Sequence, residues 1–151
     1  AAIPEVAITT DILVGFPGES DYEFAQSRDF VQEMAFAGGH VFTFSERPGT
    51  AAARMPESVP HALRKQRNAE MHRILAEGEA GYRQRFLGRE LDVLWESALS
   101  LGPQGWEMSG LTDNYLRVTA HAPATLWNQI TPVRLEQVRE SGLYGMARAC
   151  P

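Results

Sequence analysis

The first third of the chain alternates between apolar runs and a helical pattern. Val6–Gly15 (VAITTDILVG) is a nearly continuous apolar run rich in β-branched residues, as in a parallel strand covered on both faces. Ser20–Glu23 (SDYE) matches a capping box, and apolar residues then recur at helical spacing until Gly38-Gly39, which we expect to end the helix. His40–Phe44 (HVFTF) predicts a second strand. This order predicts a right-handed βαβ unit with parallel strands.

A loop and a long helix follow. The loop, residues 45–60, holds three prolines, the last of which, Pro60, lies in the first turn of the helix, where proline is tolerated. The apolar face of the helix continues to about Leu87, and Gly88 ends it. Arg67 falls in the register of that face, within the densest basic stretch of the chain, Leu63–Arg67 (LRKQR).

From Arg89 onward, short runs alternate between apolar and polar residues. They are separated by the turn-forming clusters LGPQG, SGLTDN and HAPAT. Short strands at this spacing predict a small antiparallel all-β barrel. We therefore place a domain boundary near residues 86–89, with an α/β part over residues 1–87 and the barrel over residues 88–151. The alternating runs are ELDVLWE (90–96), DNYLRVTAH (113–121) and TPVRLEQV (131–138), with GLYGMA (142–147) after them.

Composition narrows the class of protein. The 151 residues are 44% hydrophobic and 22% charged, which is ordinary for a globular protein. No apolar run approaches the roughly 20 residues that span a bilayer, and no basic region precedes an apolar one as in a signal peptide. The single cysteine, Cys150, cannot form an internal disulfide or complete a cysteine metal site. We expect a cytoplasmic protein with no membrane partner and no metal site of its own.

Charge is spread unevenly along the chain. The net charge of −5 argues against a general nucleic-acid-coating protein. Residues 1–60 carry nine acids and three arginines, whereas seven of the fourteen bases fall between Arg64 and Arg89. Thirteen of the fourteen bases are arginine, which suits bidentate phosphate recognition but equally fits a bias in genomic base composition.

The turn Gly15–Glu19 (GFPGE) is the first candidate for chemistry. It follows the first strand, and ligands of parallel α/β folds bind at the carboxyl ends of strands. Glycine lets a ligand approach the backbone, Pro17 stiffens the turn, and Glu19 could accept hydrogen bonds from ribose hydroxyls or a cationic amine. The alternative is a plain βα turn whose acid complements the helix dipole. The spacing is not that of a phosphate loop.

Longer strings carry a family resemblance. TTDILVGFPGESDYEF and HVFTFSERPGTAAARMP resemble the radical-SAM methylthiotransferases that modify tRNA, and RFLGRELDVLWE, GLTDNYLRV and ITPVRLEQV continue the match in the family's order. The resemblance covers nearly the whole chain. GLTDNYLRV is similar to the branch that acts on threonylcarbamoyladenosine beside the anticodon, rather than to the isopentenyladenosine or ribosomal-protein branches.

The resemblance implies an architecture and cofactors. Residues 1–87 would be the C-terminal part of the radical-SAM barrel, a TIM-like barrel with parallel strands, and residues 88–151 a TRAM domain, a small OB-like RNA-binding barrel. The parent enzyme would use S-adenosylmethionine and two 4Fe-4S clusters. The cysteines that ligate both clusters are missing, and Cys150 matches neither set. The chain therefore looks like a C-terminal fragment, which we expect to be inactive alone.

The resemblance also implies site residues and a partner, the anticodon stem-loop of a tRNA. Tyr115 would stack on a base and Arg117 would hold phosphate. Arg47 and Arg54 flank the barrel mouth, although ordinary solvated arginines explain them equally well. The expected cofactor-binding residues are Val14, Gly15, Phe16, Glu19, Phe44 and Ser45, and the expected RNA-binding residues are Arg47, Arg54, Arg89, Asn114, Tyr115, Arg117 and Arg134.

Two other interpretations fit the same residues. The chain could be a non-catalytic RNA-binding protein, although the buried-type strand Val6–Gly15 needs neighbours, or part of another radical-SAM enzyme that binds no RNA. The three tryptophans could stack on bases, but packing explains them better, above all for Trp95 on its apolar face.

An open strand edge, with Ile8, Ile12 and Val14 partly exposed, predicts a symmetric dimer through the N-terminal half.

Overall fold

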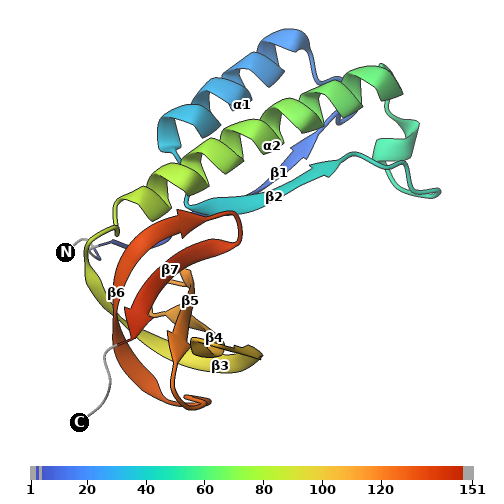
Figure 1. Cartoon of the computed structure of the whole chain (residues 1–151). Coiled ribbons are helices and arrows are strands. Elements are labelled where there is room, and N and C mark those ends of the chain that lie inside the picture. Colours follow the sequence, from blue (N-terminus) through green and yellow to red (C-terminus); the bar gives the residue numbers. More distant parts are fainter. Residues whose placement is uncertain (1–2, 4, 148–151) are drawn as a thin grey trace. The chain divides into compact units, whose positions relative to one another are not determined.

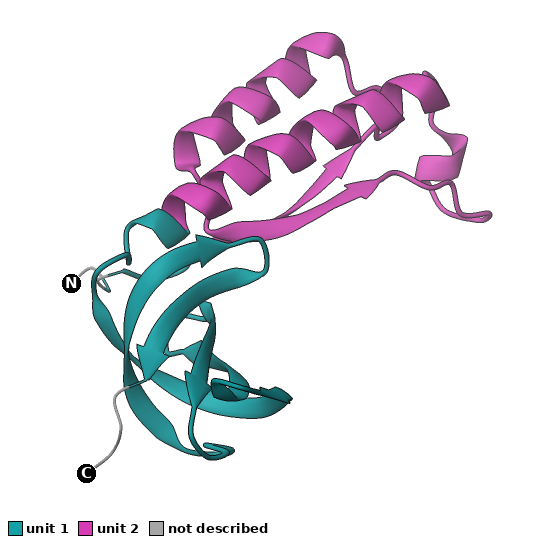
Figure 2. Cartoon of the chain, in the orientation of Figure 1, with its two compact units in different colours: residues 1–7, 83–151 teal, residues 8–82 magenta. Residues whose placement is uncertain are grey.

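The computed structural model describes residue 3 and residues 5–147. The chain divides into two compact units, residues 8–82 and residues 83–151 together with 1–7 (Figure 2). The division falls inside the long helix α2 (His61–Gln84), slightly before the expected boundary near residues 86–89. The described residues among the first seven group with the second unit, whereas the sequence had assigned them to the first.

The unit of residues 8–82 contains a two-stranded parallel sheet and two long helices. Strands β1 (Thr9–Val14) and β2 (Gly38–Thr43) pair in parallel, with Thr9 opposite Gly38 and Val14 opposite Thr43. Helix α1 (Asp21–Met34) connects the two strands, as the βαβ prediction requires. A short 3-10 helix, η1 (Ala52–Arg54), interrupts the loop that leads to α2.

Helix α1 begins as expected but ends differently. The predicted capping box is confirmed: the Glu23 N–H donates to the Ser20 hydroxyl at 3.2 Å, and the Ser20 N–H donates to the Glu23 carboxylate at 2.8 Å. The C-cap, however, is Ala35 in the left-handed conformation, and Gly38-Gly39 already belongs to β2. Gly39 is instead required by the close approach of β1, because a Cβ at this position would lie 2.2 Å from the Thr10 carbonyl oxygen.

Both helices cover the same side of the sheet (Figure 1). Ile12, Val14 and Val41 face the helices and belong to one apolar core. The opposite face is open: Leu13 and Phe42 lie directly across from each other and are 50% and 53% exposed. The expectation that Ile8, Ile12 and Val14 are partly exposed was wrong for Val14, which strand alternation turns into the core, whereas Ile12 is half-buried and Ile8 is 52% exposed. The core residues are Val14, Phe24, Val31, Phe36, Val41, Met71, Ile74 and Leu75.

The second unit contains a five-stranded sheet. Strand order is β3-β4-β5-β7-β6, and β6 pairs back with β3, so the sheet closes into a barrel. Four pairings are antiparallel, but β5 and β7 run parallel, which corrects the expectation of a wholly antiparallel barrel. The strands are β3 (Glu90–Gly102), β4 (Gly105–Thr112), β5 (Arg117–Ala122), β6 (Ile130–Arg139) and β7 (Gly142–Ala147).

Alternating residues fill the barrel interior, as the sequence pattern predicted. Trp95 is fully buried, and its indole N–H donates to the Thr131 hydroxyl at 2.7 Å, which confirms its interpretation as a core residue. Trp127, in contrast, is 70% exposed. Within the described part of the chain, no helix is at once long enough and apolar enough to cross a membrane. The other fully buried barrel residues are Val93, Met108, Val118, Ala120, Val133, Leu135 and Leu143.

Candidate functional site

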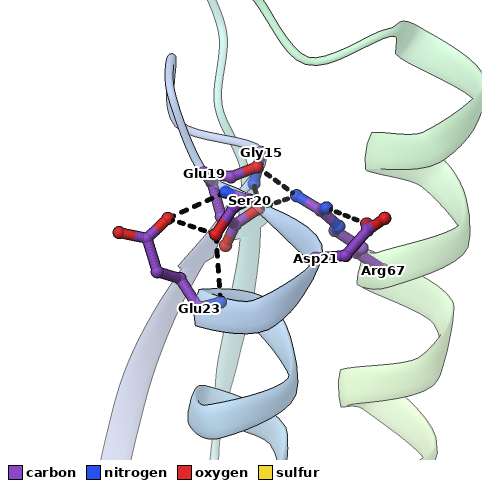
Figure 3. A network of polar contacts seen from close by, with 6 residues as sticks. All are labelled: Gly15, Glu19, Ser20, Asp21, Glu23 and Arg67. Atoms are coloured by element: carbon purple, nitrogen blue, oxygen red, sulfur yellow. Dashed lines mark hydrogen bonds and ion pairs between the residues drawn. The ribbon is translucent and has the colours of Figure 1, made fainter.

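The turn after β1 is closed by a hydrogen bond that its own glutamate accepts. Gly15 and Gly18 both have positive φ angles, +73° and +85°, which glycine adopts without steric cost. The Gly15 N–H donates to Glu19 Oε2 at 2.7 Å (Figure 3). The Glu19 N–H donates to the Phe16 carbonyl at 2.9 Å. These two bonds bring the first and last residues of the turn together.

Arg67 of α2 reaches this turn from the neighbouring helix. One terminal nitrogen donates to the Glu19 carbonyl at 3.0 Å and to Glu19 Oε2 at 2.6 Å, and the other donates to Asp21 at 2.6 Å (Figure 3). The side chain is only 3% exposed, and its guanidinium lies 5.0 Å from the centre of the Phe24 ring. We call Gly15, Glu19, Asp21 and Arg67 the turn network.

The protonation of Arg67 follows from two opposing effects. Burial lowers the pKa of the guanidinium, but hydrogen bonds to Asp21 and Glu19 raise it, and the net shift is above the ordinary value. The group is therefore a buried cation between two carboxylates. Such a charge is tolerated only where partners compensate it, and the turn network supplies acceptors for both terminal nitrogens, although the buried Nε has no hydrogen-bond partner.

The turn network changes the expected role of Glu19. From the sequence, the Glu19 carboxylate could accept hydrogen bonds from ribose hydroxyls or an amine. In the structure, its Oε2 already accepts hydrogen bonds from the Gly15 N–H and from Arg67. The side chain is 15% exposed. In this structure Glu19 braces the turn, which is a third possibility beside ligand binding and simple helix-dipole compensation.

The carboxyl ends of β1 and β2 meet beside the turn. The Phe44 N–H donates to the Val14 carbonyl at 2.9 Å, and the Phe44 carbonyl accepts from Arg64 of α2 at 2.8 Å. The rings of Phe16 and Phe44 meet edge to face with centroids 5.2 Å apart. Of the expected cofactor residues here, the side chain of Val14 is buried in the core, whereas Phe16 is 38% exposed.

A hollow of about 380 Å³ opens at the end of β2. It brings together three residues that the sequence had singled out, Phe44, Ser45 and Arg47. Arg54 is exposed in the nearby η1, outside the lining. A hollow of this size falls in the range of small-molecule sites. The full lining is Leu13, Phe42, Thr43, Phe44, Ser45, Arg47, Thr50 and Ala52.

On the barrel, Tyr115 projects from a hydrogen-bonded turn. It is 80% exposed and has a φ of 62°, which is uncommon for a bulky residue. The Leu116 N–H donates to the Thr112 hydroxyl at 2.9 Å, and that hydroxyl donates to the Asn114 side chain at 2.5 Å. Asn114 thus shapes the turn, and together with Tyr115 and Leu91 it lines a hollow of about 270 Å³.

Each expected RNA-binding arginine of the barrel lies beside an acid. Arg117 donates to Glu96 at 2.6 Å, and Arg134 lies opposite Glu90 across β3 and β6. Arg89 forms a bidentate ion pair with Glu5, and the hydrogen bond from Arg89 is the main reason that the pKa of Glu5 is lowered. The local positive charge of this surface is therefore smaller than the arginine positions alone suggested.

Arg64 and Arg67 were not among the expected site residues. A signal for Arg67 was present in the sequence, because an arginine in the apolar register of a helix must find a carboxylate or leave a buried charge unpaired. Arg64 gave no such signal, since its contact depends on how closely α2 approaches Gly15. Over residues 3 and 5–147, no cluster of three or more histidine, cysteine or acidic side chains is arranged to hold a metal, and Cys150 lies outside these residues.

Comparisons with known proteins show which proteins the chain resembles. No protein-family model matches the chain. It is 34% identical over 145 residues to the tRNA-2-methylthio-N(6)-dimethylallyladenosine synthase of Maricaulis maris (strain MCS10), a match covering 96% of the chain and 31% of that protein. A protein of the same name from Desulfitobacterium hafniense (strain Y51) is 31% identical over 147 residues, 97% of the chain and 32% of that protein.

A relative with a different named substrate matches equally well. The threonylcarbamoyladenosine tRNA methylthiotransferase MtaB of Bacillus subtilis (strain 168) is 32% identical over 137 residues, 89% of the chain and 30% of that protein. Identity therefore does not separate the two substrate branches. The chain spans about a third of the length of these relatives. Over the stretch that it matches, the chain belongs to the tRNA methylthiotransferase family.

Proposed function

We propose that the chain is the C-terminal part of a radical-SAM methylthiotransferase that adds a methylthio group to a modified adenosine beside the tRNA anticodon. Residues 1–87 would end the radical-SAM barrel, and residues 88–151 would form the TRAM domain. The single observation that carries this proposal is similarity to tRNA methylthiotransferases over 96% of the chain. Such an enzyme works on tRNA in the cytoplasm.

The first unit would supply one side of the S-adenosylmethionine site. The hollow at the end of β2 joins an aromatic ring, Phe44, with the hydroxyl of Ser45 and the guanidinium of Arg47. An adenine can stack on the ring, and ribose or carboxylate oxygens can accept from the polar groups. When bound, S-adenosylmethionine supplies the radical and the methyl group, while Phe44, Ser45 and Arg47 would hold and orient it.

The iron–sulfur clusters do not fit this chain. A 4Fe-4S cluster is held by cysteine thiolates, and the sequence contains one cysteine. We propose that both clusters are held by other parts of the parent enzyme and that the chain by itself does not cleave S-adenosylmethionine.

The barrel unit would bind the anticodon stem-loop. Its five strands run in the order β3-β4-β5-β7-β6, so the last hairpin inserts beside the third strand, as in a Greek-key barrel of the OB type. Folds of this type bind oligonucleotides through strand faces and loops. We propose that Tyr115 stacks on a base and that Arg117 contacts phosphate after exchanging its partner Glu96. GLTDNYLRV supports the threonylcarbamoyladenosine branch.

The open face of the β1–β2 sheet would also make the isolated chain self-associate. Leu13 and Phe42 are each about half exposed and lie directly opposite each other. In the parent enzyme, we propose, this face looks into the barrel interior, whereas in the isolated chain a second copy covers it.

An RNA titration tests the barrel's part in this function. A synthetic anticodon stem-loop is titrated against the chain, Arg117→Ala and Glu96→Gln at two salt concentrations. Arg117→Ala should weaken binding about 3- to 10-fold and reduce the salt slope by about 1, as for a lost phosphate contact. Glu96→Gln should strengthen binding, because it releases Arg117 and removes a negative charge.

Arg28→Ala serves as the control, because it removes the same charge from α1, where Arg28 is paired with Asp29. It should leave the salt slope unchanged. If Arg117→Ala has no more effect than Arg28→Ala, Arg117 is not a phosphate contact. If the unmodified chain shows no salt-dependent binding, the barrel is not the RNA-binding part.

A further inference from the structure

Helix α2 holds the carboxyl ends of β1 and β2 through two arginines. Arg64 and Arg67 lie one helical turn apart, so their side chains leave α2 on the same face. We propose that these two are positioning residues, which fix the backbone of the Gly15–Glu19 turn and of Phe44 in the geometry that receives a ligand. The ligand assignment rests on the proposed function, whereas the positioning itself rests on the contacts that Arg64 and Arg67 make.

Arg67 acts on the end of β1 through Glu19. Its guanidinium donates to the Glu19 carbonyl and carboxylate and to Asp21. The same carboxylate oxygen accepts the Gly15 N–H at 2.7 Å. Hydrogen bonds therefore run without interruption from α2 to the residue that follows β1 (Figure 3). Rotating Gly15 out of its position would break a charge-assisted bond.

Arg64 acts on both strand ends. Its aliphatic chain lies against Gly15 so closely that a Cβ there would come 2.2 Å from Arg64 Cγ and 2.6 Å from Cδ. Its terminal nitrogen donates to the Phe44 carbonyl at 2.8 Å. One side chain thus packs on the residue after β1 and hydrogen-bonds the residue after β2, which also fixes the edge-to-face pair of Phe16 and Phe44.

Stability alone is a poor reason for this arrangement. Buried ion pairs can often be replaced by apolar side chains without loss of stability, because desolvation offsets much of the attraction. The planar guanidinium of arginine donates to a carbonyl and two carboxylates from two nitrogens in a fixed geometry, whereas lysine has all its donors on a single nitrogen of a flexible chain and an apolar side chain has none. The turn network is therefore better explained by the need for a defined backbone geometry at the strand ends.

Hydrogen exchange at the Gly15 amide measures the positioning directly. We compare the full 151-residue chain with Arg67→Met, Arg67→Lys and the control Arg73→Met, using core amides of Ile12 and Val41 as internal references. Arg73 lies on the same helix and binds Glu77 at 2.6 Å but is 60% exposed. Arg67→Met should speed Gly15 exchange about tenfold or more through local opening, Arg67→Lys less, and Arg73→Met not at all.

A milder variant protects the test against misfolding. Asp21→Asn removes the negative charge of one acceptor of Arg67, on a side chain that is 90% exposed, and it should speed Gly15 exchange by about 2- to 5-fold with the core amides unchanged. If Arg67→Met does not fold, Gly15 exchange in Arg67→Lys and Asp21→Asn tests the proposal instead. Unchanged Gly15 exchange in the folded variants overturns the positioning proposal.

A titration with S-adenosylmethionine separates the two proposals. Amide shifts of Phe44 and Ser45 are followed in the chain and in Arg67→Lys. Shifts in the chain that shrink in the variant support positioning of a ligand site. The titration is run at a chain concentration at which the chain is monomeric, because Leu13 and Phe42 of the proposed dimer face also line the hollow. Faster Gly15 exchange in the variant, with no response of the unmodified monomer to S-adenosylmethionine, upholds the positioning by Arg67 and counts against the proposed cofactor site instead.

Discussion

At the scale of single residues, Gly15 meets two requirements at once. Its φ of +73° lies in the left-handed region, and its open side is occupied by the Arg64 side chain. Gly18 has a similar φ of +85°, but no atom lies within 4 Å of the place where its Cβ would be. A comparison of the two positions therefore distinguishes two effects. At Gly18 a side chain would meet only backbone strain, whereas at Gly15 it would also collide with Arg64.

We predict that Gly15→Ala lowers the free energy of unfolding by about 2–4 kcal/mol, because strain and a displaced Arg64 add together. Gly18→Ala should cost only about 1 kcal/mol, the penalty of the left-handed backbone alone. Urea unfolding followed by circular dichroism measures both. Equal losses in the two variants would show that Arg64 moves aside freely.

At the scale of elements, the start of α1 depends on an ionised side chain. The Glu23 carboxylate accepts from the Ser20 backbone N–H and from the Ser20 hydroxyl, at 2.8 Å and 2.7 Å. These bonds, the backbone one first, lower the pKa of Glu23 below its ordinary value of 4.5. Because the folded-state pKa is lower than the unfolded one, ionised Glu23 stabilises the fold above pH 4.5, and this contribution is lost as the pH falls through the folded-state pKa.

We therefore expect Glu23→Gln to destabilise the chain at pH 7 and to lose this effect in acid, where both side chains are neutral. Unfolding free energies of the two proteins, measured from pH 7 to pH 3, should converge. Glu33→Gln, near the C-terminal end of the same helix, is the control and should not destabilise at pH 7, because an acid there opposes the helix dipole. A Glu23→Gln deficit that stays constant with pH would rule out the charged cap.

At the scale of the whole molecule, the open face of the β1–β2 sheet governs association. Leu13 and Phe42 form its apolar centre, and apolar burial contributes about 25 cal/mol per Å². We predict that sedimentation equilibrium of the chain shows a monomer–dimer equilibrium and that Phe42→Lys shifts it at least about tenfold toward monomer, since a buried lysine would lose its hydration.

Tyr22→Lys is the control for that measurement. Tyr22 is 71% exposed but lies on α1, away from the open sheet face, so the exchange adds the same charge without touching the proposed interface. The dimer should persist in this variant. A monomer at every concentration of the unmodified chain, or equal effects of the two lysines, would show that the sheet face does not mediate association.

Local patterns in the sequence were sufficient to predict most helices and strands. The capping box at Ser20, the helix through Arg67 and the alternation around Trp95 each depend on residues a few positions apart, and each is found in the structure. The predictions were wrong where the role of a residue depends on a contact with a residue far away in the sequence. Gly39 was interpreted as a helix stop, but it makes room for the backbone of β1.

By itself, the sequence determined the elements, their order and the family resemblance, because hydrophobic periodicity, caps and long motifs are properties of neighbouring residues. Only the tertiary structure decided which strand face is open, that β7 enters the barrel parallel to β5, and that Glu19 is engaged by Arg67. These features depend on contacts between residues far apart in the chain, such as the 48 positions between Glu19 and Arg67, and no local pattern specifies such distances.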